Sequence, residues 1–171
     1  MTDELLVVRA QLGERAALAE LVRRWHPRVW TYTRRMLDAG RADDVTQEIW
    51  LAVVRGLPRL REPGRFTPWL FTVARRAVAD RLREEYGRAE EPAAAEPAAG
   101  DPVEAMVDRA SLVAGLAALP VAEREVLVLF YLEELTVEEC AQVCGIPPGT
   151  VKSRLNRARR LLARRLRESH G

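Results

Sequence analysis

The 171-residue sequence is poor in the residues that build metal and catalytic centres. It has only two histidines, His26 and His170, and two cysteines, Cys140 and Cys144. Two thiols cannot complete a tetrahedral zinc site, and no histidine lies near them in the chain. No serine–histidine–aspartate set, paired-carboxylate motif or glycine-rich phosphate loop is present. We therefore expect no enzyme activity, no metal and no cofactor, and we interpret the cysteines as small buried side chains in a reducing cytosol.

The sequence also lacks signals for export, membrane insertion and β-structure. Aromatic residues make up 6% of it, and no apolar run approaches the length of a membrane span. The opening residues, MTDELLVVRAQLGE, have neither the basic start nor the long apolar core of a secretory signal. No strand-like alternation and no internal repeat appear. These absences predict an all-α, cytoplasmic protein without membrane insertion of its own.

The stretch from Thr136 to Arg160 has the pattern of a helix, a tight turn and a second helix. Thr136 and Glu139 have the spacing of a capping box, which starts a helix. Gly145 is the residue type that ends a helix in a left-handed turn, and Pro148 suits the first position of the next helix. Apolar residues then recur at helical spacing: Val151, Leu155, Ala158 and Leu162. Together these signals predict a DNA-binding helix-turn-helix.

Charge is distributed unevenly around this motif. From Pro148 to Gly171, Lys152 and seven arginines stand against Glu168 alone, a net charge of +7. From Ala105 to Pro147 two arginines stand against seven acidic residues, a net charge of −5. The overall net charge of +2 therefore hides a strongly basic last helix. A basic helix in a helix-turn-helix indicates binding to nucleic acid, whereas a basic helix alone is often only a solvated surface.

Two helical units separated by a change of composition account for the rest of the chain. Residues 87–102, GRAEEPAAAEPAAGDP, are rich in alanine, proline and glutamate without apolar periodicity, which predicts a flexible linker. We therefore expect small helical domains over residues 1–86 and 103–171. An opening helix pair should bend near Gly13. Further helices are expected over residues 27–40, 42–56 with Leu51 facing inward, 68–86 capped by Thr67, 103–119 and 121–134.

The chain resembles the extracytoplasmic-function (ECF) group of the sigma-70 family of bacterial transcription initiation factors. Four blocks in family order carry the resemblance: RADDVTQEIWLAVVRG at 41–56, FTPWLFTVARRAVADRLR at 66–83, LPVAEREVLVLFYL at 119–132 and GIPPGTVKSRLNRARR at 145–160. They are similar to regions 2.2, 2.3 with 2.4, 4.1 and 4.2 of that family. Two positions depart from the family pattern, since Thr46 replaces a usual valine or leucine and Arg76 replaces a common asparagine.

The resemblance implies a sigma factor that directs core RNA polymerase to promoter DNA, and it implies an anti-sigma factor as a further partner. It places a polymerase-binding patch on Asp43, Asp44, Gln47 and Glu48. It places recognition of the single-stranded −10 element on a region 2 bundle, at Arg65, Phe66, Trp69, Arg76, Asp80 and Arg83, with loop residues 61–64 close by. It places recognition of the −35 element on the region 4 helix-turn-helix, at Thr150, Lys152, Ser153, Arg154, Asn156, Arg157 and Arg160.

Side-chain chemistry divides the last group into base readers and phosphate contacts. Arg157 can pair with a guanine edge and Asn156 with an adenine edge, and Ser153 lies on the same face. Lys152, Arg154, Arg159 and Arg160 suit phosphates, and Thr150 lies at the helix N-terminus. Two other functions remain open at this point. The second half alone also fits a helix-turn-helix regulator such as a response-regulator output domain, and a pure protein–protein adaptor would show no salt-dependent DNA binding.

Overall fold

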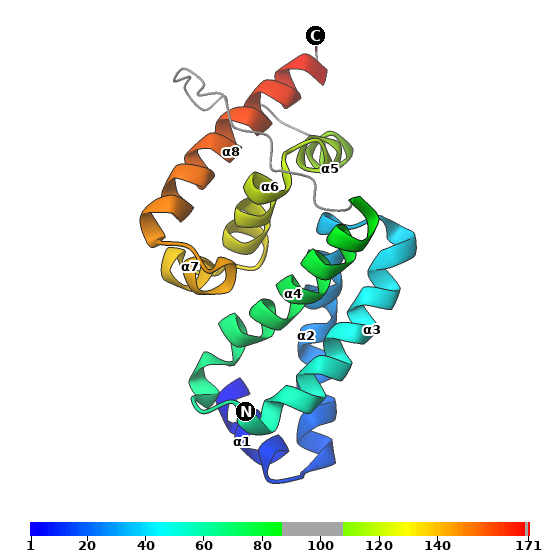
Figure 1. The fold of residues 1–171 in the computed structure, drawn as a ribbon, viewed down its shortest axis with the longest axis vertical. Helices are drawn as coiled ribbons and strands as arrows, with labels where there is room; N and C mark the ends of the chain where they lie inside the picture. Colours follow the sequence, from blue (N-terminus) through cyan, green and yellow to red (C-terminus); the bar gives the residue numbers. More distant parts are fainter. Residues whose placement is uncertain (87–107, 170) are drawn as a thin grey trace. The chain divides into compact units, whose positions relative to one another are not determined.

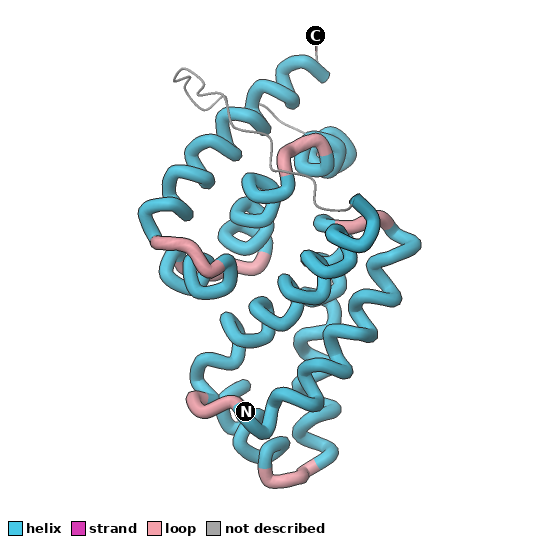
Figure 2. The backbone as a smooth tube through the Cα atoms, in the orientation of Figure 1, coloured by secondary structure: helices cyan, strands magenta, loops and turns pink. Residues whose placement is uncertain are grey.

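The computed structural model describes residues 1–86, 108–169 and 171. The predicted linker at 87–102 and the first residues of the expected helix 103–119 lie outside these described residues. Within them every regular element is a helix, so the predicted all-α fold is confirmed (Figures 1 and 2). The described residues divide into two compact units, the first over residues 1–86 and the second over the described residues from 108 onward.

The first unit packs four α-helices around a core of apolar side chains (Figure 1). The chain bends at Gly13, which has the positive φ of 92° that glycine tolerates, so the predicted bend is confirmed. Leu21, Val29 and Tyr32 line the inner face of the second helix and are at most 1% exposed. The helices are α1 (Asp3–Gln11), α2 (Arg15–Met36), α3 (Ala39–Gly56) and α4 (Phe66–Tyr86).

The predicted helix boundaries around Pro27 and Ala39 were wrong. Pro27 lies inside α2, on its exposed side, where a carbonyl left without its N–H partner can bond to water. Ala39 does not end a helix but begins α3, because the side chain of Asp38 accepts a hydrogen bond from the Arg41 N–H at 3.1 Å and caps it. One continuous α2 therefore spans the predicted break.

The connection between α3 and α4 consists of two short 3₁₀ turns, η1 (Leu57–Arg59) and η2 (Pro63–Arg65). We call residues 57–65 the α3–α4 loop. The helix α4 starts directly at Phe66, so Thr67 is not its cap. Leu51 was also predicted wrongly: it is 57% exposed, because Val45, Ile49 and Val53 already occupy the buried face of α3.

The second unit comprises shorter helices that support one long terminal helix. The single helix predicted over 121–134 is instead an α-helix followed by a π-helical turn, in which the Glu133 N–H bonds to the Val128 carbonyl at 3.0 Å. Gly115 lies so close to Leu162 that a Cβ there would come within 2.9 Å of its Cδ1. The elements are α5 (Arg109–Ala117), α6 (Val121–Leu127), η3 (Val128–Leu132), α7 (Val137–Cys144) and α8 (Pro148–Ser169).

The predicted helix-turn-helix is confirmed in its local details. Thr136 and Glu139 form a reciprocal capping box at the start of α7, with distances of 2.9 and 3.1 Å. Gly145 has a left-handed φ of 66° and ends that helix. Pro148 is the first residue of α8. The turn therefore fixes where the basic helix begins.

Candidate functional site

The helix α8 separates a buried apolar side from an exposed polar side. Val151, Leu155 and Ala158 are at most 2% exposed, which confirms the predicted stripe as far as Ala158, while Leu162 is half-buried. Lys152 and Ser153 are exposed, and Thr150 and Arg154 are half-buried. The first turns of α8 thus present basic and hydrogen-bonding groups to solvent at the end of a helix-turn-helix.

Asn156 belongs to a small exposed network that sequence reasoning missed. Arg159 donates hydrogen bonds to Asn156 Oδ1 at 2.9 Å and to the Tyr131 hydroxyl at 2.7 Å. Its guanidinium also lies 5.9 Å from the centre of the Tyr131 ring. The half-exposed Tyr131 belongs to η3, so it contacts α8 from a different element. The only signal in the sequence was an aromatic residue at the end of an apolar run.

Arg157 does not lie on the exposed face with Asn156. Its side chain is 25% exposed, and its Nη1 lies 3.4 Å from Oε1 of Glu123, a glutamate of α6 whose side chain is 8% exposed. The enclosed Nε of Arg157 has no hydrogen-bond partner. Arg160 is likewise half-buried. Helical spacing placed Arg157 and Arg160 opposite the apolar stripe, but both are half-buried, and Arg157 reaches across to Glu123 of α6.

In the first unit, the predicted polymerase-binding residues all lie exposed on α3. Asp43 accepts a hydrogen bond from the Trp30 indole N–H at 2.9 Å, and Glu48 pairs with Arg81 of α4 at 3.0 Å. Leu51 and Val54, 57% and 46% exposed, continue the same side of α3 toward its C-terminus. The patch therefore has acidic and amide groups at one end and apolar side chains at the other.

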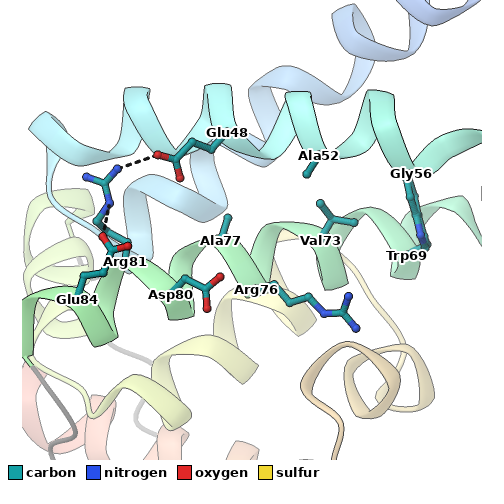
Figure 3. Close-up of a pocket in the computed structure, with 10 residues that line it drawn as sticks. All are labelled: Glu48, Ala52, Gly56, Trp69, Val73, Arg76, Ala77, Asp80, Arg81 and Glu84. Carbon is teal, nitrogen blue, oxygen red and sulfur yellow. Dashed lines mark hydrogen bonds and ion pairs between the residues drawn. The ribbon is translucent and has the colours of Figure 1, made fainter.

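A groove of about 460 Å³ runs between α3 and α4 (Figure 3). Trp69 closes one end, where its ring packs on Gly56; a Cβ on Gly56 would lie 3.0 Å from Cζ2 of that ring. Arg81 spans the groove to Glu48 and lies 3.9 Å from Glu84 (Figure 3). The half-buried Trp69 is thus a wall of the groove and not an open stacking platform.

The predicted −10 residues do not form one continuous surface. Arg65, Arg76, Asp80 and Arg83 are exposed, and Asp80 forms an ion pair with Arg83. Phe66, by contrast, is 2% exposed and packs edge-on against Trp25 with ring centres 5.8 Å apart. Phe66 therefore packs in the core at the end of the α3–α4 loop. The exposed arginines form the solvent-facing surface of this region.

Comparison with known proteins matches both units to one family. Residues 21–87 match the model of sigma-70 region 2, and residues 109–162 match the model of sigma-70 region 4. The ECF RNA polymerase sigma factor SigC of Mycobacterium tuberculosis is 33% identical over 158 residues, which cover 90% of this chain and 85% of that protein. The chain belongs to the ECF RNA polymerase sigma factors. As a sigma factor, it binds RNA polymerase and directs it to promoter DNA.

Other comparisons agree with this assignment. BldN, an ECF sigma factor of Streptomyces coelicolor, is 32% identical over 170 residues, which cover 94% of this sigma factor and 64% of BldN. The solved structure of CnrH in complex with the cytosolic domain of CnrY superposes with a TM-score of 0.71 at 25% identity, covering 94% of each chain. RpoE of Bartonella quintana, solved with the anti-sigma factor NepR, has the same fold, with a TM-score of 0.71 at 22% identity over 87% of this chain and 96% of that one.

No described helix is long and apolar enough to cross a membrane. Among the same residues, no group of histidine, cysteine and acidic side chains has an arrangement that could hold a metal ion. Cys140 and Cys144 are both buried and form no disulfide, and burial raises the pKa of Cys140 to about 12.

Proposed function

We propose that this sigma factor divides promoter recognition between its two units as the sequence predicted, with domains at 1–86 and 103–171 and a linker at 87–102. It acts by binding alone, with no catalytic centre of its own, in the cytoplasm where polymerase works. The single observation that supports this best is the confirmed helix-turn-helix with the basic side of α8 exposed. A stand-alone helix-turn-helix regulator leaves the region 2 match over residues 21–87 unexplained.

The polymerase-binding patch on α3 is the first proposed surface. Asp44, Gln47 and Glu48 are exposed there and would face a basic helical surface of the polymerase. Opposite charges speed association and fix orientation, and the exposed Leu51 would add apolar contact at the same face. We expect Asp44→Lys to weaken binding to bacterial core polymerase by at least about 10-fold, because it reverses the charge at this patch. Glu168→Lys, the same charge reversal at an exposed position near the C-terminus of α8, is the control.

The α3–α4 loop and the adjacent exposed side of α4 form the second proposed surface, which binds the opened −10 element. Arg65, Arg76 and Arg83 are exposed there and would contact the phosphates of the single strand. Asp80 forms an ion pair with Arg83 and thereby orients that arginine. A base that leaves the stack needs a fixed site, and the loop beside Arg65 would provide it.

The N-terminal half of α8 forms the third proposed surface, which reads the −35 element in the major groove. Lys152 and Arg154 would contact phosphates, and Ser153 and Asn156 would face base edges. Arg157 is paired with Glu123 in the free protein, so its side chain must leave Glu123 before it can contact a base. Arg160 and Thr150 complete the set as phosphate contacts.

An anti-sigma factor is a further proposed partner. One similar structure is a complex of this kind, RpoE with the anti-sigma factor NepR, and CnrH was solved in complex with the cytosolic domain of CnrY. A partner that covers the α3 patch would compete with polymerase for the same residues. Co-expression with a candidate anti-sigma factor, followed by a competition assay against core polymerase, tests this. Binding of both partners at once would contradict a shared surface.

A further inference from the structure

The helix α1 contacts the α3–α4 loop through one specific side chain. The amide Nε2 of Gln11 donates hydrogen bonds to the backbone carbonyls of Leu57 at 3.0 Å and Leu60 at 2.8 Å. These carbonyls lie 46 and 49 residues away in the sequence. At the other end of α1, the carboxylate of Glu4 lies next to Gly64. A Cβ added to Gly64 would lie 3.7 Å from Oε1 of Glu4. The helix therefore runs beside the loop and bonds to its backbone.

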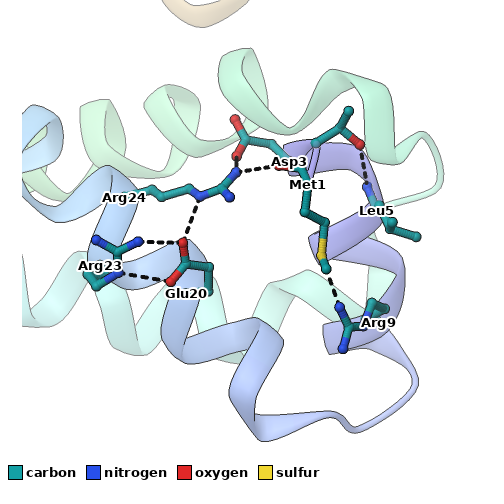
Figure 4. A network of polar contacts seen from close by, with 8 residues as sticks. Met1, Asp3, Leu5, Arg9, Glu20, Arg23 and Arg24 are labelled. Carbon is teal, nitrogen blue, oxygen red and sulfur yellow. Dashed lines mark hydrogen bonds and ion pairs between the residues drawn. The ribbon is translucent and has the colours of Figure 1, made fainter.

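The helix α1 is itself fixed to the body of the unit. Leu6 and Val7 are buried at 2% and 0% exposure. Arg24 of α2 donates to the Met1 carbonyl at 2.7 Å and to Asp3 at 3.1 Å, while Glu20 holds the same guanidinium at 2.9 Å (Figure 4). A side chain carried by α1 is thus held at a defined position relative to α2. Because Gln11 bonds to the loop backbone, it also fixes the loop relative to α2.

The two amide hydrogens of Gln11 are directed at backbone carbonyls of the α3–α4 loop. The Leu57 carbonyl also accepts from the Leu60 N–H at 3.1 Å, so Gln11 gives it a second hydrogen bond and joins it to the carbonyl of Leu60. Gln11 supplies both of its amide hydrogens, and only a donor group can do so, because two carbonyl oxygens converge on it. The matched region 2 model starts at residue 21, so Gln11 lies outside it.

We propose that Gln11 is a positioning residue for −10 recognition, which holds the α3–α4 loop in the conformation that receives the unstacked base. The proposal rests on the proposed role of that loop in −10 binding. Without Gln11, DNA binding itself must order the loop. The free energy needed for this ordering makes promoter opening less favourable. Loss of hydrogen bonds of this kind corresponds to about a 2- to 10-fold change in an equilibrium for each bond.

The test uses the full chain reconstituted with bacterial core polymerase on a promoter selected from a random library by the wild-type holoenzyme. Permanganate reactivity of unpaired thymines at −10 measures opening. We expect Gln11→Ala to reduce opening by about 10-fold and Gln11→Glu to reduce it at least as much, because a carboxylate repels both carbonyls. Gln11→Lys, a long donor-only side chain, should retain most of it. Leu12→Ala, at the neighbouring 82% exposed position, is the control.

Three further measurements separate this role from a general structural one. Affinity for core polymerase and affinity for a −35 duplex should stay unchanged in Gln11→Ala. Hydrogen exchange of the amides in residues 57–65 should become faster. Arg65→Ala tests the loop directly. If Arg65→Ala reduces opening and Gln11→Ala behaves like Leu12→Ala, the role of Gln11 is refuted while the loop keeps its function. If neither variant reduces opening, both proposals are wrong.

Discussion

Arg157 of α8 and Glu123 of α6 form a partly buried ion pair of 3.4 Å in the second unit. The glutamate is nearly enclosed, so its charge depends on the arginine for compensation. The Nε of Arg157 has no hydrogen-bond partner, so one buried donor of this arginine stays unpaired in the free protein. A residue expected to read DNA therefore also stabilises the domain that carries it.

Removal of Arg157 alone should destabilise the second unit. Arg157→Ala leaves the charge of Glu123 enclosed and unpaired, and we expect it to lower the free energy of unfolding by about 2 kcal/mol. The double variant Glu123→Gln with Arg157→Ala should recover most of this loss. All four tryptophans lie between residues 25 and 69, so tryptophan fluorescence reports only the first unit, and the measurement is far-UV circular dichroism, which detects the helices of both units. Equal losses in the single and double variants would show that the pair contributes no stability.

The same pair determines how the DNA role of Arg157 must be measured. In the Glu123→Gln background, Arg157→Ala should cost about 1–3 kcal/mol on the preferred −35 duplex and relax sequence preference. Lys152→Ala, a change at an exposed phosphate-binding position, should weaken binding to all sequences alike and reduce the salt dependence. Fluorescence anisotropy of holoenzyme on preferred and scrambled −35 duplexes checks this. Equal losses on both duplexes for Arg157→Ala would refute its role as a base reader.

Thr46 is a buried threonine whose hydroxyl has no hydrogen-bond partner. Thr46→Val replaces that hydroxyl with a methyl group of similar size and should raise the free energy of unfolding of the first unit by about 1 kcal/mol. Thr33→Val is the matched control, because the buried Thr33 hydroxyl donates to the Val29 carbonyl at 2.8 Å. That variant should not stabilise the protein. Urea unfolding followed by tryptophan fluorescence compares the two, and a loss of stability in Thr46→Val would contradict the prediction.

Cys140 should make stability depend on pH above neutrality. Burial raises the pKa of this thiol from 9.0 to about 12, so its native form stays protonated while the unfolded form ionises. Stability from this group is complete below pH 9 and is lost as the pH rises toward 12, by at most about 1.4 kcal/mol per pH unit. Cys140→Ala lacks this contribution. Unfolding of both proteins between pH 8 and about 10.5 should show a steeper loss for the wild type, and parallel curves would contradict it.

Local signals in the sequence predicted the helix-turn-helix well. The capping box of Thr136 and Glu139, the glycine turn at Gly145 and the first-turn proline Pro148 each act within a few residues, so tertiary contacts had little to change. The boundaries near Pro27 and Asp38 were wrong for the opposite reason. Burial of Trp25 and Val29 on either side of Pro27 keeps α2 continuous, which no local rule includes.

The candidate sites were predictable as positions on helices but not as contacts. Helical spacing predicted that Asn156 and Arg157 would share a face, yet Glu123 lies 34 residues from Arg157 and draws it inward. Burial of Phe66 depends on Trp25 in another helix, which no pattern within one helix reveals. Gln11 gave no signal at all, because its partners are backbone atoms of a distant loop. Positions therefore followed from periodicity, and pairings required the fold.

The most direct test of the central claim is run-off transcription with purified sigma factor and bacterial core polymerase on a library of promoters randomised at −35 and −10. We expect core polymerase alone to start at no defined site, added sigma factor to give discrete transcripts, and the selected promoters to share motifs in both elements. Asp44→Lys should abolish most of these transcripts, while Glu168→Lys should keep them. Failure of the purified protein to bind core polymerase or to produce any defined start would contradict the account.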